Sequence, residues 1–94
     1  MAIQTPITNS IFENVAGGLR MEVSKFTSVA NGDTYTPAVG VIVGLSVDGG
    51  STAGTIGATW TNATPGTSPP VAAAVTFSVS TGSITNVSLI LFGY

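Results

Sequence analysis

Residues 71–79 read VAAAVTFSV, and the larger apolar side chains of this stretch fall on every second position. One face carries Val71, Ala73, Val75, Phe77 and Val79. The other face carries only small or polar residues. Successive side chains of a β-strand point to opposite faces of its sheet, so a period of two predicts a strand with one face in a core.

The same period recurs on both sides of this stretch. Residues 39–47 place on one face Val39, Val41, Val43, Leu45 and Val47. Residues 55–61 place on one face Ile56, Ala58 and Trp60. In residues 84–92, Val87, Leu89 and Leu91 alternate with Ser88, Ile90 and Phe92, so both faces of that strand are largely apolar.

A further run comes earlier, where Leu19, Met21 and Val23 alternate with Arg20, Glu22 and Ser24. The phase of this run slips at Lys25-Phe26, where we expect a β-bulge to restore it. Turn residues such as Asn31-Gly32 and Asp48-Gly49 separate the runs. Residues 19–94 therefore predict an all-β domain, a small antiparallel β-sandwich or barrel of about six strands.

Residues 1–18 follow a different pattern and are assigned as an N-terminal arm. Ile3, Ile7, Ile11 and Val15 lie four residues apart, and Ser10 and Glu13 have the spacing of a helical capping box. One or two turns of helix are therefore an option, although Pro6 favours an extended start. The arm either packs on its own sheet or docks on a neighbouring subunit.

The charge inventory excludes several classes of function. The 94 residues include 2 basic and 4 acidic side chains, no His and no Cys, whereas Thr, Ser and Gly number 14, 10 and 12. Two cations supply almost none of the electrostatic affinity on which nucleic-acid binding depends. No nucleic acid is expected as a partner.

The same inventory argues against an enzyme. A Ser or Thr nucleophile needs a neighbouring base, and the chain offers only Lys25 and four dispersed carboxylates. Asp33 and Asp48 lie beside turn glycines, where capping of the turn is the expected role. We expect no catalytic residues, no metal site and no cofactor.

No run of about 18 apolar residues is present, so no membrane-spanning helix and no membrane partner are expected. The first residues also lack the basic and apolar segments of a secretory signal. We therefore expect a protein that is made and kept in the cytoplasm of the producing cell.

Three aromatic residues, Trp60, Tyr35 and Tyr94, have the chemistry of a sugar-stacking platform. Trp60 shares its predicted face with Ile56 and Ala58, however, so we expect it in the core or in a subunit interface. A carbohydrate-binding module remains as an alternative function.

The stretch Phe26–Thr36, which reads FTSVANGDTYT, precedes a Val/Gly-rich strand, a Thr-rich strand and the closing Leu89-Ile90-Leu91-Phe92-Gly93. This layout resembles the small virion proteins of tailed bacteriophages, which include capsid decoration (cement) proteins. The resemblance implies a non-enzymatic protein on the outside of the phage head, trimeric or otherwise homo-oligomeric, that clamps neighbouring subunits of the major capsid protein. The resemblance does not identify any functional residue in this sequence.

The apolar excess of a chain this small indicates contacts between subunits. The expected interface residues lie in the arm and in the last strand: Ile3, Ile7, Ile11, Phe12, Ile90, Phe92 and Tyr94. A tail, neck or head-fibre protein and a filament subunit remain as structural alternatives.

Overall fold

The computed structural model describes residues 2–13, 17–50, 54–64, 66, 71–80 and 82–94. These residues form seven strands and contain no helix. The strands are β1 (Thr8–Phe12), β2 (Arg20–Ala30), β3 (Thr34–Tyr35), β4 (Ile42–Asp48), β5 (Ile56–Thr61), β6 (Ala74–Val79) and β7 (Ser83–Gly93). The all-β prediction is confirmed.

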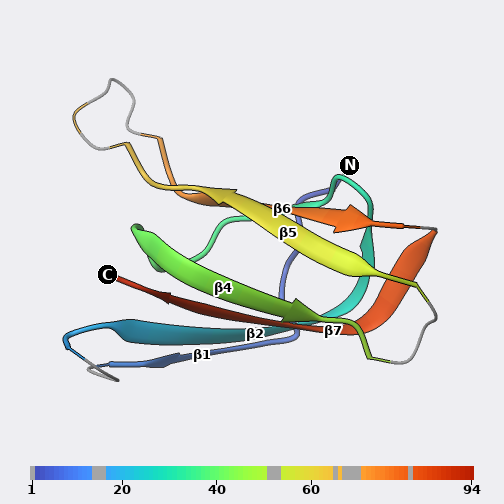
Figure 1. Ribbon diagram of the computed structural model, residues 1–94, viewed down its shortest axis with the longest axis horizontal. Coiled ribbons are helices and arrows are strands. Elements are labelled where there is room, and N and C mark those ends of the chain that lie inside the picture. The colour runs from blue at the N-terminus through green and yellow to red at the C-terminus, as the bar shows by residue number, and fades with distance from the viewer. Residues whose placement is uncertain (1, 14–16, 51–53, 65, 67–70, 81) are drawn as a thin grey trace.

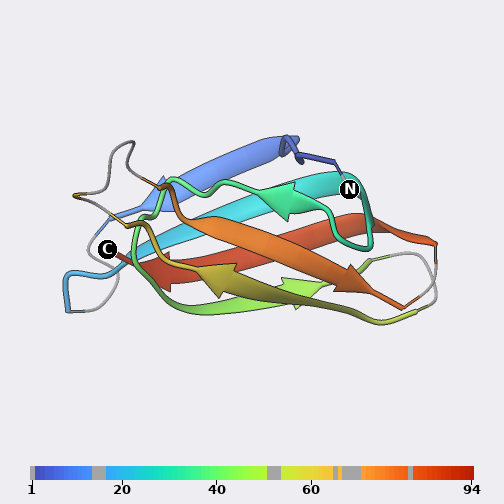
Figure 2. The same cartoon turned by 90° about the horizontal axis from the view of Figure 1, so that it is seen from above.

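The strands are arranged in two antiparallel sheets (Figure 1). A four-stranded sheet has the order β1-β2-β7-β4, and a three-stranded sheet has the order β3-β6-β5. The chain crosses between the sheets after β2, β3, β4 and β6, and Figure 2 shows the three-stranded sheet lying across the four-stranded one. The two sheets do not close on each other, so the fold is the predicted sandwich rather than a barrel.

The core lies between the inner faces of the sheets. Phe26 of β2 meets Tyr35 of β3 and Phe77 of β6 edge to face, with ring centroids 5.2 Å and 5.5 Å apart. Around these rings lie fully buried aliphatic side chains from both sheets, namely Val29, Val39, Val75, Val87, Leu89 and Leu91. Each such side chain stabilises the fold by roughly 1.5–3 kcal/mol relative to exposure, and neither sheet has a core without the other.

The stretch 71–79 folds largely as its period predicts. Ala73, Val75, Phe77 and Val79 are buried and point into the core. The strand begins only at Ala74, and Val71, which precedes it, is 55% exposed.

The prediction for residues 39–47 is wrong in its middle part. Val39 is buried, but the register of β4 against β7 shifts between Ile42 and Gly44. The shift places Ile42 in the core and leaves Val41 and Val43 exposed. After it, Leu45 and Val47 pack against the core as predicted. The single apolar face is therefore divided by a bulge, which adds one residue to a strand.

The expected bulge at Lys25-Phe26 is absent. The register of β2 against β7 runs without a shift from Arg20↔Gly93 to Ala30↔Ser83. The inward-facing residues at the start of β2 are Glu22, Ser24 and Phe26, so the apolar Met21 and Val23 point outward. The alternation of buried and exposed residues changes later, because Phe26 and Val29 are both buried although they lie three positions apart. The paired strand β7 changes at the same place, between Val87 and Ile84, where Asn86 takes a positive φ of 55°.

The N-terminal arm contains no helix in residues 2–13; Val15, the last residue of the four-residue spacing, lies outside the described residues. Thr8–Phe12 instead forms β1, which pairs antiparallel with β2. Nearer the N-terminus, Ile3 makes a parallel bridge with Thr34. The arm thus contacts both sheets of its own chain.

Candidate interaction surfaces

The outward face of the four-stranded sheet is ordered in rows, because paired residues of antiparallel strands point to the same side. From β1 to β4, the first row is Phe12, Met21, Phe92 and Gly44. The second row is Ser10, Val23, Ile90 and Ser46. The third row is Thr8, Lys25, Ser88 and Asp48. We call these twelve positions the outer face.

The outer face is apolar at one end and polar at the other. Its apolar part consists of Phe12, Met21, Val23, Ile90 and Phe92, which we call the outer patch. Phe12 is 49% exposed, and the other four are half-buried by their strand neighbours. The third row replaces these residues with one cation, one anion and two hydroxyl groups. None of the described strands lies on the outward side of the four-stranded sheet (Figure 1).

The structure brings three of the expected interface residues together and separates the others. Phe12, Ile90 and Phe92 share the outer patch. Ile11 points to the opposite side of β1, where it is 40% exposed.

The remaining three lie apart from the patch. Ile3 and Ile7 lie along the arm, where both are exposed. Tyr94 lies beside Val41, to whose carbonyl its backbone N–H donates at 2.9 Å, and its side chain is exposed.

Asp33 fastens the arm to its own chain. Its carboxylate accepts hydrogen bonds from Ala30 N at 2.9 Å, from Ala2 N at 2.9 Å and from Gln4 Nε2 at 2.6 Å. The bond from Ala30 is the largest cause that lowers the pKa of Asp33, and those from Ala2 and Gln4 add to it. Asp33 thus caps the turn after β2, as predicted, and its carboxylate also holds residues 2–4 in place.

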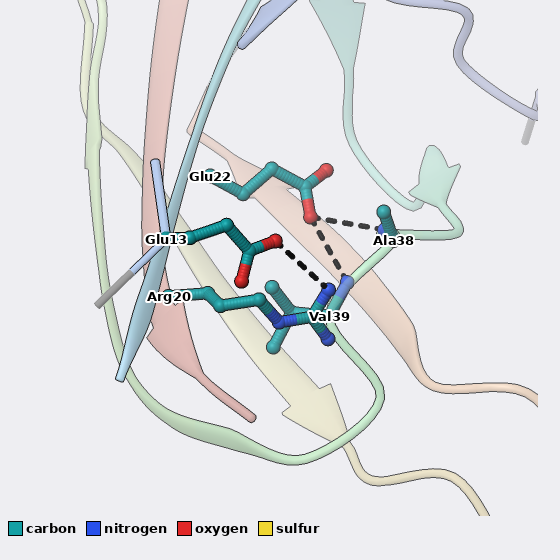
Figure 3. Close-up of polar contacts among 5 residues, drawn as sticks. All are labelled: Glu13, Arg20, Glu22, Ala38 and Val39. Atoms are coloured by element: carbon teal, nitrogen blue, oxygen red, sulfur yellow. Dashed lines mark hydrogen bonds and ion pairs between the residues drawn. The ribbon is translucent and has the colours of Figure 1, made fainter. Parts of the chain in front are cut away.

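Glu22 is the buried polar centre of the molecule. Its carboxylate accepts hydrogen bonds from Ala38 N at 2.9 Å and Val39 N at 3.1 Å, as Figure 3 shows. It also accepts a short hydrogen bond from the Tyr35 hydroxyl. These bonds tie the β3–β4 loop and β3 to β2, and they provide the partners that a buried carboxylate needs.

The Tyr35 hydroxyl extends this network toward the arm. Asn9 Nδ2 donates to it at 3.3 Å, and Ser24 Oγ lies 3.3 Å from both that hydroxyl and Asn9 Oδ1. Burial raises the pKa of Tyr35 to about 12, with a further contribution from the hydrogen bond to Glu22. Sequence reasoning missed this network because it assigned Glu22 and Ser24 to the outward face.

The remaining charged side chains lie at the surface. Arg20 and Glu13 approach to 3.9 Å between Nη1 and Oε1 (Figure 3). Lys25 and Asp48 are exposed in the third row of the outer face. Among the described residues, no three acidic side chains gather into a group suited to a metal ion.

A wide hollow lined by the arm lies between residues 3–6 and residues 35–38 and has a volume of about 360 Å³. Asn9 and Tyr35 are among the polar residues that line it, and both belong to the Glu22 network. It is open and shallow rather than enclosed.

The aromatic residues do not form one platform. Tyr35 is buried in the core, whereas Trp60 is 39% exposed near the end of β5, and Tyr94 is 55% exposed. Trp60 therefore does not lie within the core, and the other expected position, a subunit interface, stays a prediction. Its partner across the sheet, Val75, is buried, so Trp60 covers the margin of the core rather than its centre.

The site residues thus define a class of protein, a two-sheet β-sandwich with an uncovered apolar face. Comparison with protein-family models, with curated proteins and with solved structures finds no match to this chain. Within the described ranges, no helix has the length and apolar character needed to cross a membrane.

Proposed function

We propose that this chain is a non-enzymatic structural protein of a tailed-phage virion, namely a capsid decoration protein that binds the outside of the head and stabilises contacts between major capsid subunits. One observation carries the proposal. Among the described residues, nine large apolar side chains are 39–81% exposed, and the full chain has only six charged residues. Apolar surface on this scale is typical of a protein that functions in an assembly.

The arm is the surface that we assign to the capsid. Its backbone is fastened to β2 and β3, with Gln4 N donating to Thr34 O at 2.7 Å and Ile7 N to Lys25 O at 2.7 Å. Ile3 and Ile7 are 81% and 63% exposed on this rigid support. A fixed apolar ridge loses little conformational entropy when it binds, which favours a stable contact with a neighbouring protein.

The test uses heads of the encoding phage that lack this protein. Labelled protein is mixed with the heads at increasing concentration, and bound protein is measured after sedimentation. Saturation at a fixed number of copies per head supports decoration, and the absence of binding to heads contradicts it. Binding to tails or necks in electron micrographs of the labelled particles would instead identify a tail, neck or head-fibre protein.

The role of the arm is tested by the double variant Ile3→Ser/Ile7→Ser. We expect at least tenfold weaker attachment with an unchanged circular dichroism spectrum, because both side chains are exposed and make no core contact. The matched control is Val71→Ser, an exposed apolar residue outside the arm. Unchanged attachment of the double variant would refute the assignment of the arm while leaving decoration itself intact.

The exposure of Trp60 favours a second candidate, a carbohydrate-binding module. An exposed indole on an edge strand is able to stack on a sugar ring. Binding on a glycan array that is lost in Trp60→Ala and retained in Tyr94→Ala would support this function over decoration.

A further inference from the structure

Each row of the outer face is complementary to the same row read in the opposite direction, from β4 to β1. The first row has large side chains at its β1 end, and at its β4 end it has Gly44, above which a Cβ would meet no atom within 4 Å. The third row has the cation Lys25 in its β1–β2 half and the anion Asp48 at its β4 end. The first row therefore has a protrusion at one end and a hollow at the other, and the third row has a positive charge in one half and a negative charge in the other. The second row has Ser10 and Ser46 at its ends and Val23 and Ile90 between them, so it reads alike in both directions.

From this arrangement we infer that the outer face binds a second copy of the same chain, with a two-fold axis that runs parallel to β2 and β7 between them. This inference is independent of the proposed virion function. Rotation about this axis leaves each row at the same position along the strands and reverses the order of its residues. Strands β1, β2, β7 and β4 of one copy therefore lie over β4, β7, β2 and β1 of the other. Aligned sheets pack in this way at a separation of about 10 Å.

The pairing fills the face with matching groups. Phe12 lies over the partner's Gly44, Met21 over the partner's Phe92, and Val23 over the partner's Ile90. The outer patch of each copy is thus covered by the outer patch of the other. This burial gives the half-exposed side chains the apolar contacts that their own chain does not supply.

The charges select this axis over the alternative one. A two-fold axis perpendicular to the strands would place the third row over the first and bury Lys25 against apolar side chains. That arrangement is unfavourable because a buried charge without a partner is costly. With the parallel axis, the half of the third row that carries Lys25 lies over the half that carries the partner's Asp48. Within one chain β7 separates Lys25 from Asp48, so each charge is available to the other copy.

The first test is the mass in solution, measured by light scattering over a range of concentrations. We expect twice the 9.4 kDa of one chain, that is, a dimer among the homo-oligomers, trimeric or other, that the phage resemblance implies. Ile90→Lys introduces a charge at the centre of the outer patch and is expected to give a monomer. Val71→Lys is the matched control and is expected to remain a dimer. A monomeric or trimeric parent protein, or a dimeric Ile90→Lys variant, would overturn the inference.

The second test concerns the axis itself. Lys25→Asp and Asp48→Lys should each weaken the dimer about tenfold at low salt, the effect of two exposed ion pairs of ordinary strength, and the double exchange should restore it. Failure of the double exchange to restore association would exclude the proposed orientation.

A cross-linking experiment fixes the order of the rows. The chain has no Cys, and Ser10 and Ser46 lie on the two edge strands of the sheet, so they are far apart within one copy. In the dimer, Ser10 lies over the partner's Ser46. The double variant Ser10→Cys/Ser46→Cys should therefore give a covalent dimer with a short bis-maleimide, whereas Ser10→Cys alone should not. Cross-linking of the single variant would contradict the reversed order.

Discussion

Glu22 joins three parts of the chain because one carboxylate receives all the donors that surround it. Ala38 N and Val39 N come from the loop before β4, and the Tyr35 hydroxyl comes from β3. Val39, whose N–H is one of these donors, is itself fully buried. A residue that reads as surface charge in the sequence thus determines how the chain passes from the three-stranded sheet back to the four-stranded one.

Tyr35→Phe is expected to destabilise the protein by about 1–3 kcal/mol, because the buried carboxylate loses a donor and no other group replaces it. Chemical denaturation at pH 7 measures this change in the free energy of unfolding. A change below about 0.5 kcal/mol would show that the hydroxyl contributes little beyond the packing of its ring.

Tyr35 also predicts a pH dependence at the alkaline end. Its pKa is raised from 10.0 to about 12 in the folded protein, so folding favours the neutral phenol. This stabilisation is complete below pH 10 and is lost as the pH rises through about 12. The alkaline loss of stability should be smaller in Tyr35→Phe than in the parent protein, as measured by thermal unfolding at pH 9 to 12.

For Asp33 we predict a loss of stability at acidic rather than at alkaline pH. Its pKa is lowered below 3.8 by the bonds to Ala30, Ala2 and Gln4, so its stabilisation is present above pH 3.8 and lost as the pH falls through the lowered value. The protection factor of the Thr34 amide against hydrogen exchange should fall over that range, since its N–H donates to Ala2 O at 2.9 Å. Asp33→Asn should show a lower protection factor already at pH 7 and little further change in it on acidification.

The strands differ in how much of their placement is visible in the sequence. The period of two identifies β6 and β7 and their buried faces, because every inward residue from Val87 to Leu91 is aliphatic. The same rule fails in β2, where inward positions carry Glu22 and Ser24 and outward ones carry Met21 and Val23. Extending the phase of Phe26 backwards without a slip would have found the correct face. The bulge in β4 could not be predicted from the alternation of apolar residues, since Val41 and Val43 fit the period of two and yet are exposed to solvent.

Close strand packing at β7 makes Gly93 intolerant of any side chain. A Cβ at this position would lie 2.5 Å from Val39 Cγ1 and 2.0 Å from Val41 O, a backbone atom that has no room to move. Gly93→Ala should cost about 1–3 kcal/mol or more through overpacking. The matched control is Gly57→Ala in β5, where a Cβ meets nothing within 4 Å; there we expect a gain of about 0.5–1 kcal/mol. Equal effects in denaturant titrations would contradict this reading of the β4–β7 contact.

At the scale of the whole molecule, the two sheets share one core, and the molecule measures 39 × 31 × 19 Å. The uncovered outer patch follows from this two-layer form. Composition alone indicates an apolar excess, but only the register of β1, β2, β7 and β4 shows which side chains gather and which point apart. That is why sequence reasoning named Phe12, Ile11 and Ile90 alike as interface residues, although Phe12 and Ile90 share the outer face and Ile11 points to the opposite side.

The shared core also predicts a single cooperative unfolding transition. Trp60 fluorescence reports on the three-stranded sheet, and slow amide exchange in β2 and β7 reports on the four-stranded one. Both should give the same denaturation midpoint, because removal of either sheet exposes Phe26 and Phe77 together. Two separate midpoints would show that one sheet persists alone.

The position of β7 has a consequence for synthesis on the ribosome. This strand forms the middle of the four-stranded sheet, yet its residues 83–93 are translated after those of the other six strands. Until they emerge, β2 and β4 have no partner between them, and the aliphatic side chains that face the gap stay in water. The hairpin of β5 and β6 is able to form earlier, but the sandwich is not. Formation of the sandwich therefore has to wait until β7 has been synthesised, and before that point the nascent chain exposes apolar side chains to proteases and chaperones.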